Sequence, residues 1–409
     1  MKKNYLVIIG VVFSNLLFCQ FAGISLNDVY STDSSSAWVV GESGTIIHVV
    51  DGGMYWEDQS YDTDLSLNSI QFIEEQKGFI VGDSGILLKT DDGGITWDAI
   101  DLGVSYDFES IAFVDNQYGW ISAYPSLFSG NGLFRTEDGG EDWVHIETEV
   151  VYPFFLDSLY GWGSPSSIGG IFVCRTYDGG FSWDTLSYQV SMSIPFFFFY
   201  DETNGFMNKS YFDLTTCYNT HDGGVEWTSN GTQIEVSYLS DRLFLDTLNG
   251  WLSGHSNVFY SNDYFNSYEV FNQPYDVFNA LSIHGASNGW AVSYNLQNTN
   301  STIWRLEGVN NWIPIETIGV DELTSYSEIK SYPNPFTTST TIKYELTEPS
   351  HIQLTIYNTI GETIYVAQDG IKQQGKHTFT WSPESLPEGL YYGVLRSEEG
   401  VSVVKIIKQ

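Results

Sequence analysis

Carboxylates are the side chains of this 409-residue protein most able to do chemistry, since it has 51 Asp and Glu against 16 Lys and Arg. Paired carboxylates hydrolyse glycosidic bonds, and clustered ones bind calcium. No D-x-D-x-D-G calcium loop occurs, and the seven histidines lack the H-E-x-x-H spacing of a zinc site. The G-x-S-x-G elbow and the P-loop are also absent from the sequence. We therefore predict no cofactor, with calcium kept as a minor hypothesis.

One acidic residue recurs within an octapeptide, T-x-D-G-G-x-x-W, which we term the box. Clear copies begin at residues 90, 136, 176 and 220, a fifth at 49–56 lacks the Thr, and weaker copies surround Asp263 and Glu307. The carboxylate can accept backbone N–H groups, the glycines permit a tight turn, and the tryptophan can cover the flank of the next repeat. The box is therefore predicted to be structural, through Asp51, Asp92, Asp138, Asp178, Asp222 and Asp263 with Trp56, Trp97, Trp143, Trp183 and Trp227.

A second pattern, D-x-x-x-G followed by Trp or Phe, keeps the same phase at residues 115–120, 157–162, 201–206 and 246–251. The period is 40 to 46 residues, and each repeat contains four short strand-like runs, in the second repeat at 69–73, 78–81, 86–89 and 96–100. Seven such units are typical of a β-propeller. We predict an all-β fold, in which residues 20–317 form a seven-bladed β-propeller followed by a small C-terminal β-sandwich.

The N-terminus carries the pattern of a signal peptide. Two lysines precede an apolar run at residues 6–18, which is too short to span a membrane, so we predict a signal peptide over residues 1–19 and no transmembrane segment. Export would permit a disulfide, but Cys174 and Cys217 lie on equivalent strands with opposite parity. We therefore expect two buried free thiols. The net charge of −35 excludes nucleic acid as a partner.

Composition changes near residue 329. Residues 20–328 contain seven basic and 43 acidic residues, a net charge of −36, whereas residues 329–409 contain seven basic and eight acidic ones. A polar linker is predicted at residues 318–331, and short alternating strands over residues 332–409 favour a β-sandwich.

Two resemblances follow from these motifs. The box resembles the Asp-box, or bacterial neuraminidase (BNR) repeat, and its phase with G-W/F-x-x-G resembles the seven-bladed propeller of the photosystem II assembly-factor type. Residues 332–409 are similar to the C-terminal sorting domain of type IX secretion cargo. The match includes the run Tyr332-Pro333-Asn334-Pro335-Phe336, the residues Gly361, Gly389 and Tyr391, the run Gly375-Lys376-His377, and the basic end Lys405-Ile406-Ile407-Lys408.

These resemblances imply the protein's destination. The sorting domain implies export through the type IX secretion machinery to the medium or outer-membrane surface of a Gram-negative bacterium.

A sialidase is excluded because its three substrate-binding arginines have no counterpart among the propeller's four. Three of those four (Arg135, Arg175 and Arg305) precede box acids on third strands.

The predicted function is a non-catalytic, secreted or cell-surface binding module for a glycan or a protein. The alternative is a secreted glycoside hydrolase that uses a carboxylate pair at the propeller channel. An assembly scaffold rests on analogy with the photosystem factors alone.

Overall fold

The computed structural model describes residues 20–53, 55–123, 132–165, 171–189, 196–211, 214–236, 239–285, 287–315, 318–319, 329–346, 349–358, 363–383, 386–387, 389–397 and 400–408. The chain divides into two compact units, one comprising Met1–Ile47 and Gln59–Ile315, the other His48–Asp58 and Glu316–Gln409. Over the described residues, no helix has the length and apolar character needed to cross a membrane. The predicted signal peptide, Cys19 and most of the predicted linker lie outside the described residues.

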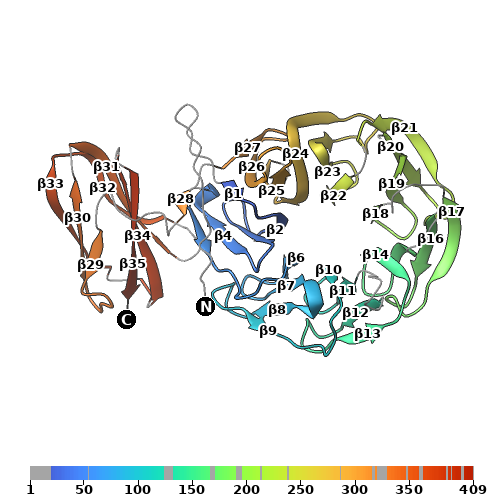
Figure 1. Cartoon of the computed structure of the whole chain (residues 1–409), viewed down its shortest axis with the longest axis horizontal. Helices are drawn as coiled ribbons and strands as arrows, with labels where there is room; N and C mark the ends of the chain where they lie inside the picture. The colour runs from blue at the N-terminus through green and yellow to red at the C-terminus, as the bar shows by residue number, and fades with distance from the viewer. Residues whose placement is uncertain are drawn as a thin grey trace. The chain divides into compact units, whose positions relative to one another are not determined.

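The first unit consists of antiparallel sheets arranged around a central opening (Figure 1). Five sheets each correspond to one predicted blade, and their strands run outward in chain order. They are β2 (Leu26–Ser31), β3 (Ala37–Gly41), β4 (Ile46–Val50) and β5 (Tyr55–Asp58); β6 (Leu67–Phe72), β7 (Gly78–Gly82), β8 (Leu87–Thr90) and β9 (Asp98–Ala99); β10 (Phe108–Phe113), β11 (Gly119–Ala123), β12 (Gly132–Thr136) and β13 (Val144–Ile146); β14 (Val150–Phe155), β15 (Gly161–Pro165), β16 (Ile171–Thr176) and β17 (Asp184–Gln189); and β18 (Phe197–Phe199), β19 (Gly205–Tyr211), β20 (Leu214–Thr220) and β21 (Thr228–Ile234).

Blades 6 and 7 form one continuous sheet, which the sequence did not predict. Its strands are β22 (Leu239–Phe244), β23 (Gly250–Ser261), β24 (Glu269–Ile283), β25 (Asn288–Asn295), β26 (Asn300–Glu307) and β27 (Trp312–Pro314). The long β24 is the outer strand of blade 6 and then the inner strand of blade 7, because it pairs first with β23 and then with β25. The N-terminal strand β1 (Gln20–Ala22) and β27 both pair with β26, so the two ends of the propeller meet in blade 7.

The box forms a compact hydrogen-bonded turn between the third and fourth strands. In blade 2, the Thr90 hydroxyl donates to Asp92 Oδ1 (2.8 Å) and accepts the Gly94 N–H (2.8 Å), while Asp92 Oδ1 also accepts the Thr96 N–H (2.9 Å). Burial opposes ionisation of Asp92 slightly, but these hydrogen bonds hold its pKa below the ordinary range. Blades 3, 4 and 5 repeat the turn, and blade 6 repeats it with Ser261 in place of Thr. In these blades the carboxylate closes the turn, and its assignment as a structural residue stays a prediction.

The second pattern holds neighbouring blades together. An aromatic ring on the second strand stacks on an aromatic residue that ends the first strand of the following blade, as Trp162 does on Phe199 (centroids 3.6 Å, planes 6° apart). Phe199 lies over Gly205 of its own blade, where a Cβ would come within 2.5 Å of the ring. The glycine of D-x-x-x-G is thus needed because the adjacent ring occupies the space of a side chain. The aspartate caps the hairpin, since Asp201 Oδ1 accepts the N–H groups of Thr203 and Asn204.

The box tryptophans contact the preceding blade, so the prediction that they cover the next blade is wrong. Trp97 packs edge-on against Trp38 of blade 1 (6.0 Å), and Trp143 against Phe79 of blade 2 (6.4 Å). The direction follows from the box glycines, which leave room for the preceding blade's ring. A Cβ on Gly94 would lie 2.4 Å from Trp38.

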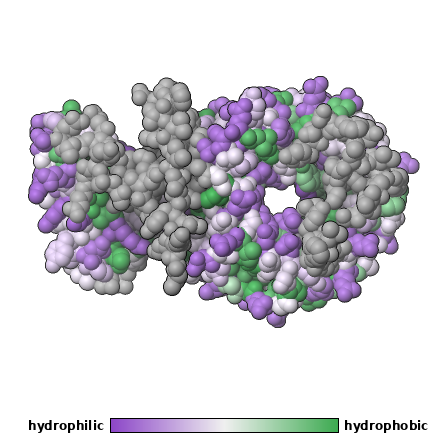
Figure 2. All heavy atoms as spheres, in the orientation of Figure 1, coloured by the Kyte–Doolittle hydropathy of each residue, from purple (hydrophilic) through white to green (hydrophobic). Residues whose placement is uncertain are grey.

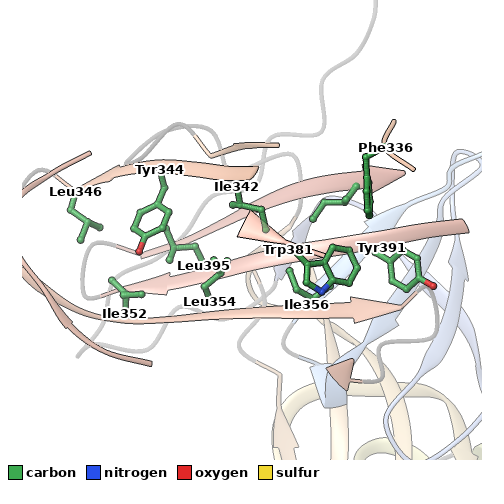
Figure 3. Packing of buried hydrophobic residues seen from close by; sticks show 11 residues of the cluster. Phe336, Ile342, Tyr344, Leu346, Ile352, Leu354, Ile356, Trp381, Tyr391 and Leu395 are labelled. Carbon is green, nitrogen blue, oxygen red and sulfur yellow. The ribbon is translucent and has the colours of Figure 1, made fainter. Parts of the chain in front are cut away.

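The second unit takes in β5 and residues 48–50 of β4 and contains two further sheets. One has β29 (Lys330–Tyr332), β30 (Thr340–Leu346) and β33 (Gly375–Trp381); the other has β32 (Thr363–Lys372), β31 (Ser350–Asn358), β34 (Gly389–Ser397) and β35 (Gly400–Lys408). Their core runs between the sheets from Leu346 and Ile352 at one end to Phe336, Trp381 and Tyr391 at the other (Figure 3). This is the predicted β-sandwich. A short strand, β28 (Ile318–Gly319), lies within the predicted linker and pairs with β5.

Two buried tryptophans test the contribution of the blade junctions. The Trp162 indole N–H donates to the Gly223 carbonyl in the next blade's box (2.8 Å), whereas that of Trp290 has no hydrogen-bond partner among the described residues. Trp162→Phe should therefore lower the free energy of unfolding by about 1 kcal/mol more than Trp290→Phe does, because it leaves a buried carbonyl unpaired. Urea unfolding followed by circular dichroism measures both, and equal losses would contradict the assignment.

Candidate functional site

The central channel is the place where a carboxylate pair would act in the predicted hydrolase. It is bordered by the inner strands β2, β6, β10, β14, β18 and β22 and the C-terminal half of β24, and Figure 2 shows an open centre with hydrophilic residues beside it. Among the described residues, the inner strands carry the acids Asp28, Glu109, Asp241 and Asp276. Asp241 is close enough to Asp28 for its negative charge to raise the pKa of Asp28.

Both of these aspartates tie their own blade to the next one. Asp28 Oδ2 accepts the Ile70 N–H (2.8 Å) and the Ser69 hydroxyl (2.9 Å) of β6. Asp241 Oδ2 accepts the Leu281 N–H (2.9 Å) of β24. Each aspartate follows a register shift in its strand, which turns the carboxylate toward the neighbouring blade. Their oxygens are therefore used in holding the ring together.

Burial dominates the ionisation of this group. It raises the pKa of Asp28 to about 7, aided by the negative charge of Asp241. It raises the pKa of Asp241 to about 6, although backbone N–H donors and Arg242 oppose the change. Arg242, whose Nε donates to the Phe197 carbonyl (3.0 Å), has its pKa lowered by burial to about 10. Asp28 and Asp241 can therefore hold a proton near neutral pH. Their hydrogen bonds, however, are those of a contact that clamps one blade to the next.

Amide side chains at the same register shift make a second set of clamps, which sequence reasoning missed. Asn279 donates to the Leu26 carbonyl (2.7 Å), Asn27 to the Leu67 carbonyl (2.9 Å) and Asn68 to the Phe108 carbonyl (2.9 Å). These bonds join blades 7 to 1, 1 to 2 and 2 to 3. The signal was available in the sequence, because each asparagine follows an apolar residue at the same phase of the repeat.

The arginines expected on third strands are found there, away from the channel. Arg135 lies on β12 and donates to the Ser158 carbonyl of blade 4 (3.2 Å). Arg175 lies on β16 and contacts the ring of Tyr177 (4.4 Å), and Arg305 lies on β26 beside Glu307 (2.6 Å). Of the four propeller arginines, only Arg242 is on an inner strand. The arginine triad of a sialidase is therefore absent from the channel.

The remaining sequence predictions concern thiols and metals. Cys174 and Cys217 are buried free thiols, and burial raises the pKa of Cys217 to about 12. Within the described residues, no group of three or more His, Cys, Asp or Glu could hold a metal ion. Asp51 of the first box belongs to the second unit, in which its carboxylate pairs with Arg396 (3.1 Å).

Blade 4 differs from its neighbours at the box rim. Leu159, Tyr177 and Phe181 are 48%, 44% and 53% exposed, and the Gly179 N–H donates to the Leu159 carbonyl, so the hairpin and the box loop adjoin. The three corresponding residues are Gln76, Asp91 and Ile95 in blade 2 and Gln117, Glu137 and Glu141 in blade 3. We term Leu159, Tyr177 and Phe181 the aromatic rim.

The sorting motifs converge at one end of the sandwich. Asn334 donates to the Lys405 carbonyl (2.5 Å) and accepts the Ile407 N–H (2.8 Å), while the buried Phe336 ring packs against Trp381 (5.8 Å). Three further motif residues fix the same end: Lys408 donates to the Leu386 carbonyl, the Tyr391 hydroxyl to the Pro387 carbonyl, and Gly389 begins β34. Gly361 lies outside the described residues.

The raised pKa of Asp28 predicts a specific pH dependence. Folded Asp28 keeps its proton up to about pH 7, whereas the ordinary value is 3.8, so the folded state binds an extra proton in between. This stabilisation is complete below the unfolded pKa and is lost as the pH rises through about 7. Asp28→Asn removes it, so the free energy of unfolding of D28N relative to the wild type should rise between roughly pH 4 and 8.

Asp201→Asn provides the control for this measurement. Slight burial works in the opposite direction, but hydrogen bonds from Asn204 and Thr203 lower the pKa of Asp201 to about 2. Its stability difference from the wild type should stay level over the same pH range in urea unfolding experiments. A level difference for D28N as well would contradict the assigned proton.

Comparison with known proteins agrees with both units. The family model of photosynthesis system II assembly factor YCF48 matches residues 13–103 and 54–154, and that of the secretion system C-terminal sorting domain matches residues 330–409. No curated protein matches the sequence. The sorting domain marks the protein as type IX cargo, secreted or displayed on the surface of a Gram-negative bacterium.

Solved structures show the propeller fold. "YCF48 bound to D1 peptide" has a TM-score of 0.55 at 18% identity, covering 75% of this chain and 99% of that one. YCF48 from Cyanidioschyzon merolae has a TM-score of 0.54 at 14% identity (70% and 96% covered), and the WD40 propeller of Doa1 0.51 at 11% (69% and 93%). The chain thus has a propeller similar to those of YCF48 and, over residues 330–409, matches the secretion system C-terminal sorting domain.

Proposed function

We propose that the propeller is an exported, non-catalytic binding module whose ligand is a glycan or a protein. The observation that supports this best is the aromatic rim of blade 4. Tyr177 and Phe181 present about half of their surface to solvent, and among the Phe, Tyr and Trp side chains described in the propeller only Phe172 and Tyr275 are also exposed. Exposed rings offer a large, rigid contact area to a sugar or to a protein side chain at little entropic cost.

The rim is pre-organised for binding. The Arg135 guanidinium lies 5.3 Å from the Phe181 ring, and that of Arg175 lies 4.4 Å from the Tyr177 ring. Tyr160 contacts Tyr177 edge-on (5.6 Å). Because these contacts already restrict each exposed ring, ordering it on binding would cost little conformational entropy. The peptide named with the similar YCF48 structure makes a protein segment a reasonable form of ligand for this fold.

The non-catalytic part of the proposal rests on the channel. Asp28 and Asp241 give their oxygens to backbone N–H groups of the next blade. A hydrolase needs one carboxylic acid and one carboxylate that face the substrate with free oxygens. One observation favours the alternative of a glycoside hydrolase: the pKa of Asp28 is raised to about 7, which suits a general acid.

A glycan array probed with the purified full-length protein tests the proposal. The double variant Tyr177→Ala, Phe181→Ala should bind at least about tenfold more weakly than the wild type, as expected when hot-spot aromatic residues are truncated. Ile95→Ala is the matched control, because Ile95 is the blade 2 equivalent of Phe181 and is 63% exposed. Binding is measured with calcium and with a chelator, which tests the calcium hypothesis.

The outcomes separate the ligand classes. If the array is silent, the same three proteins are compared for capture of surface proteins from the producing bacterium. Equal binding by the double variant and the wild type in both assays would reject the rim as the site. Hydrolysis of a bound glycan that is abolished in a folded D28N variant would instead establish the hydrolase.

A further inference from the structure

The sorting motifs contain residues that build the sandwich and residues that are largely exposed to solvent. Phe336 is 3% exposed in the core, and the Lys408 ammonium group binds the Leu386 carbonyl. In contrast, Tyr332 is 74% exposed, and Pro333 and Pro335 beside it are exposed as well. Because so little of the Tyr332 side chain is buried, it contributes little to the stability of the sandwich. The presence of Tyr332 in the motif therefore needs another reason.

Asn334 brings these exposed residues to the last strand. Its side-chain amide donates to the Lys405 carbonyl (2.5 Å) and accepts the Ile407 N–H (2.8 Å), as a neighbouring strand would. The Phe336 N–H then donates to the Ile407 carbonyl (2.9 Å), and β29 lies against β35. On β35, Lys405 and Ile407 point outward while Ile406 between them is buried.

The result is one continuous surface, which we term the sorting face: Tyr332, Pro333, Pro335, Lys405 and Ile407. We propose that the type IX secretion machinery binds the sorting face through a protein surface that offers apolar contacts to Tyr332 and Ile407 and carboxylates to Lys405. The occupant follows from the domain's identity, because a secretion sorting domain must be bound by the machinery that exports it.

Charge supports the same partner. The region that contains the sorting face has seven basic and eight acidic residues, whereas residues 20–328 carry a net charge of −36. An acidic partner surface would therefore be repelled by the propeller and accepted at the sorting domain, which orients the cargo during encounter. Aromatic and apolar contacts at the centre would supply the affinity.

A second exposed apolar group in the same unit provides a control. Tyr365, Val366 and Ile371 lie on β32, and Ile371 is 72% exposed, about as much as Tyr332. None of the sorting-motif residues lies on this strand. Likewise the half-buried Lys372 ends β32, which is the opposite edge strand of its sheet from β35.

Export of the full chain in a bacterium with a type IX apparatus tests the proposal. Tyr332→Ser and Lys405→Glu should each lower the exported fraction, in medium plus cell surface, by roughly tenfold, with accumulation in the periplasm. Ile371→Ser and Lys372→Glu remove an apolar and a basic side chain outside the sorting face and should be exported like the wild type. Immunoblots of the separated fractions provide the measurement.

A thermal unfolding scan of each purified full-length variant separates recognition from folding. We expect unchanged unfolding temperatures for all four, since each altered side chain is exposed or half-exposed. Normal export of both Tyr332→Ser and Lys405→Glu would overturn the proposal, as would an equal defect in Ile371→Ser. If Tyr332→Ser proves unstable, Lys405→Glu decides alone, because only the side chain of Lys405 is changed and its backbone bond to Asn334 remains.

Discussion

The propeller depends on aromatic rings that stack across junctions between successive blades. Trp120 stacks on Phe155 (3.8 Å), Trp162 on Phe199 (3.6 Å) and Phe79 on Phe113 (5.2 Å), each time joining a second strand to the first strand of the following blade. The aromatic residue that ends each of these first strands lies over a glycine, because any side chain there would collide with its ring. The capping aspartate holds in place the hairpin that follows each of these strands. The repeated pattern D-x-x-x-G-W/F therefore encodes this one contact between blades.

Polar contacts complete the ring where aromatic ones are missing. At the closure between blades 7 and 1, the Ser31 N–H and hydroxyl meet the Ser282 hydroxyl (2.8 and 2.9 Å), and Asn279 clamps the Leu26 carbonyl. Strand β1 adds backbone pairing to β26 at the same place. The inner carboxylates Asp28 and Asp241 belong to this set of clamps. Their oxygens already accept hydrogen bonds from the next blade and are not free for catalysis. An acidic channel therefore does not by itself imply a hydrolase.

Function is then left to positions that the repeat does not need. The box fixes Thr, Asp, two Gly and Trp, but the residues between them face solvent and vary from blade to blade. In blade 4 these positions carry Tyr177 and Phe181, and in blade 3 Glu137 and Glu141. The sorting domain follows the same logic, because Phe336 and Lys408 build the sandwich while Tyr332 and Lys405 remain available to a partner.

The sequence by itself determined the blade number, the four-stranded unit and the sorting motifs, because each is a local pattern repeated or spaced along the chain. Tertiary structure decided what those patterns touch. The direction of the box tryptophans, the merging of blades 6 and 7 through β24, and the tethering role of Asp28 and Asp241 all depend on the neighbouring blade. Such contacts join residues about 40 positions apart, or up to about 280 at the ring closure, and no local pattern specifies them. Likewise, only folding places Asn334 beside Lys405, about 70 residues away, and so creates a single face from two motifs.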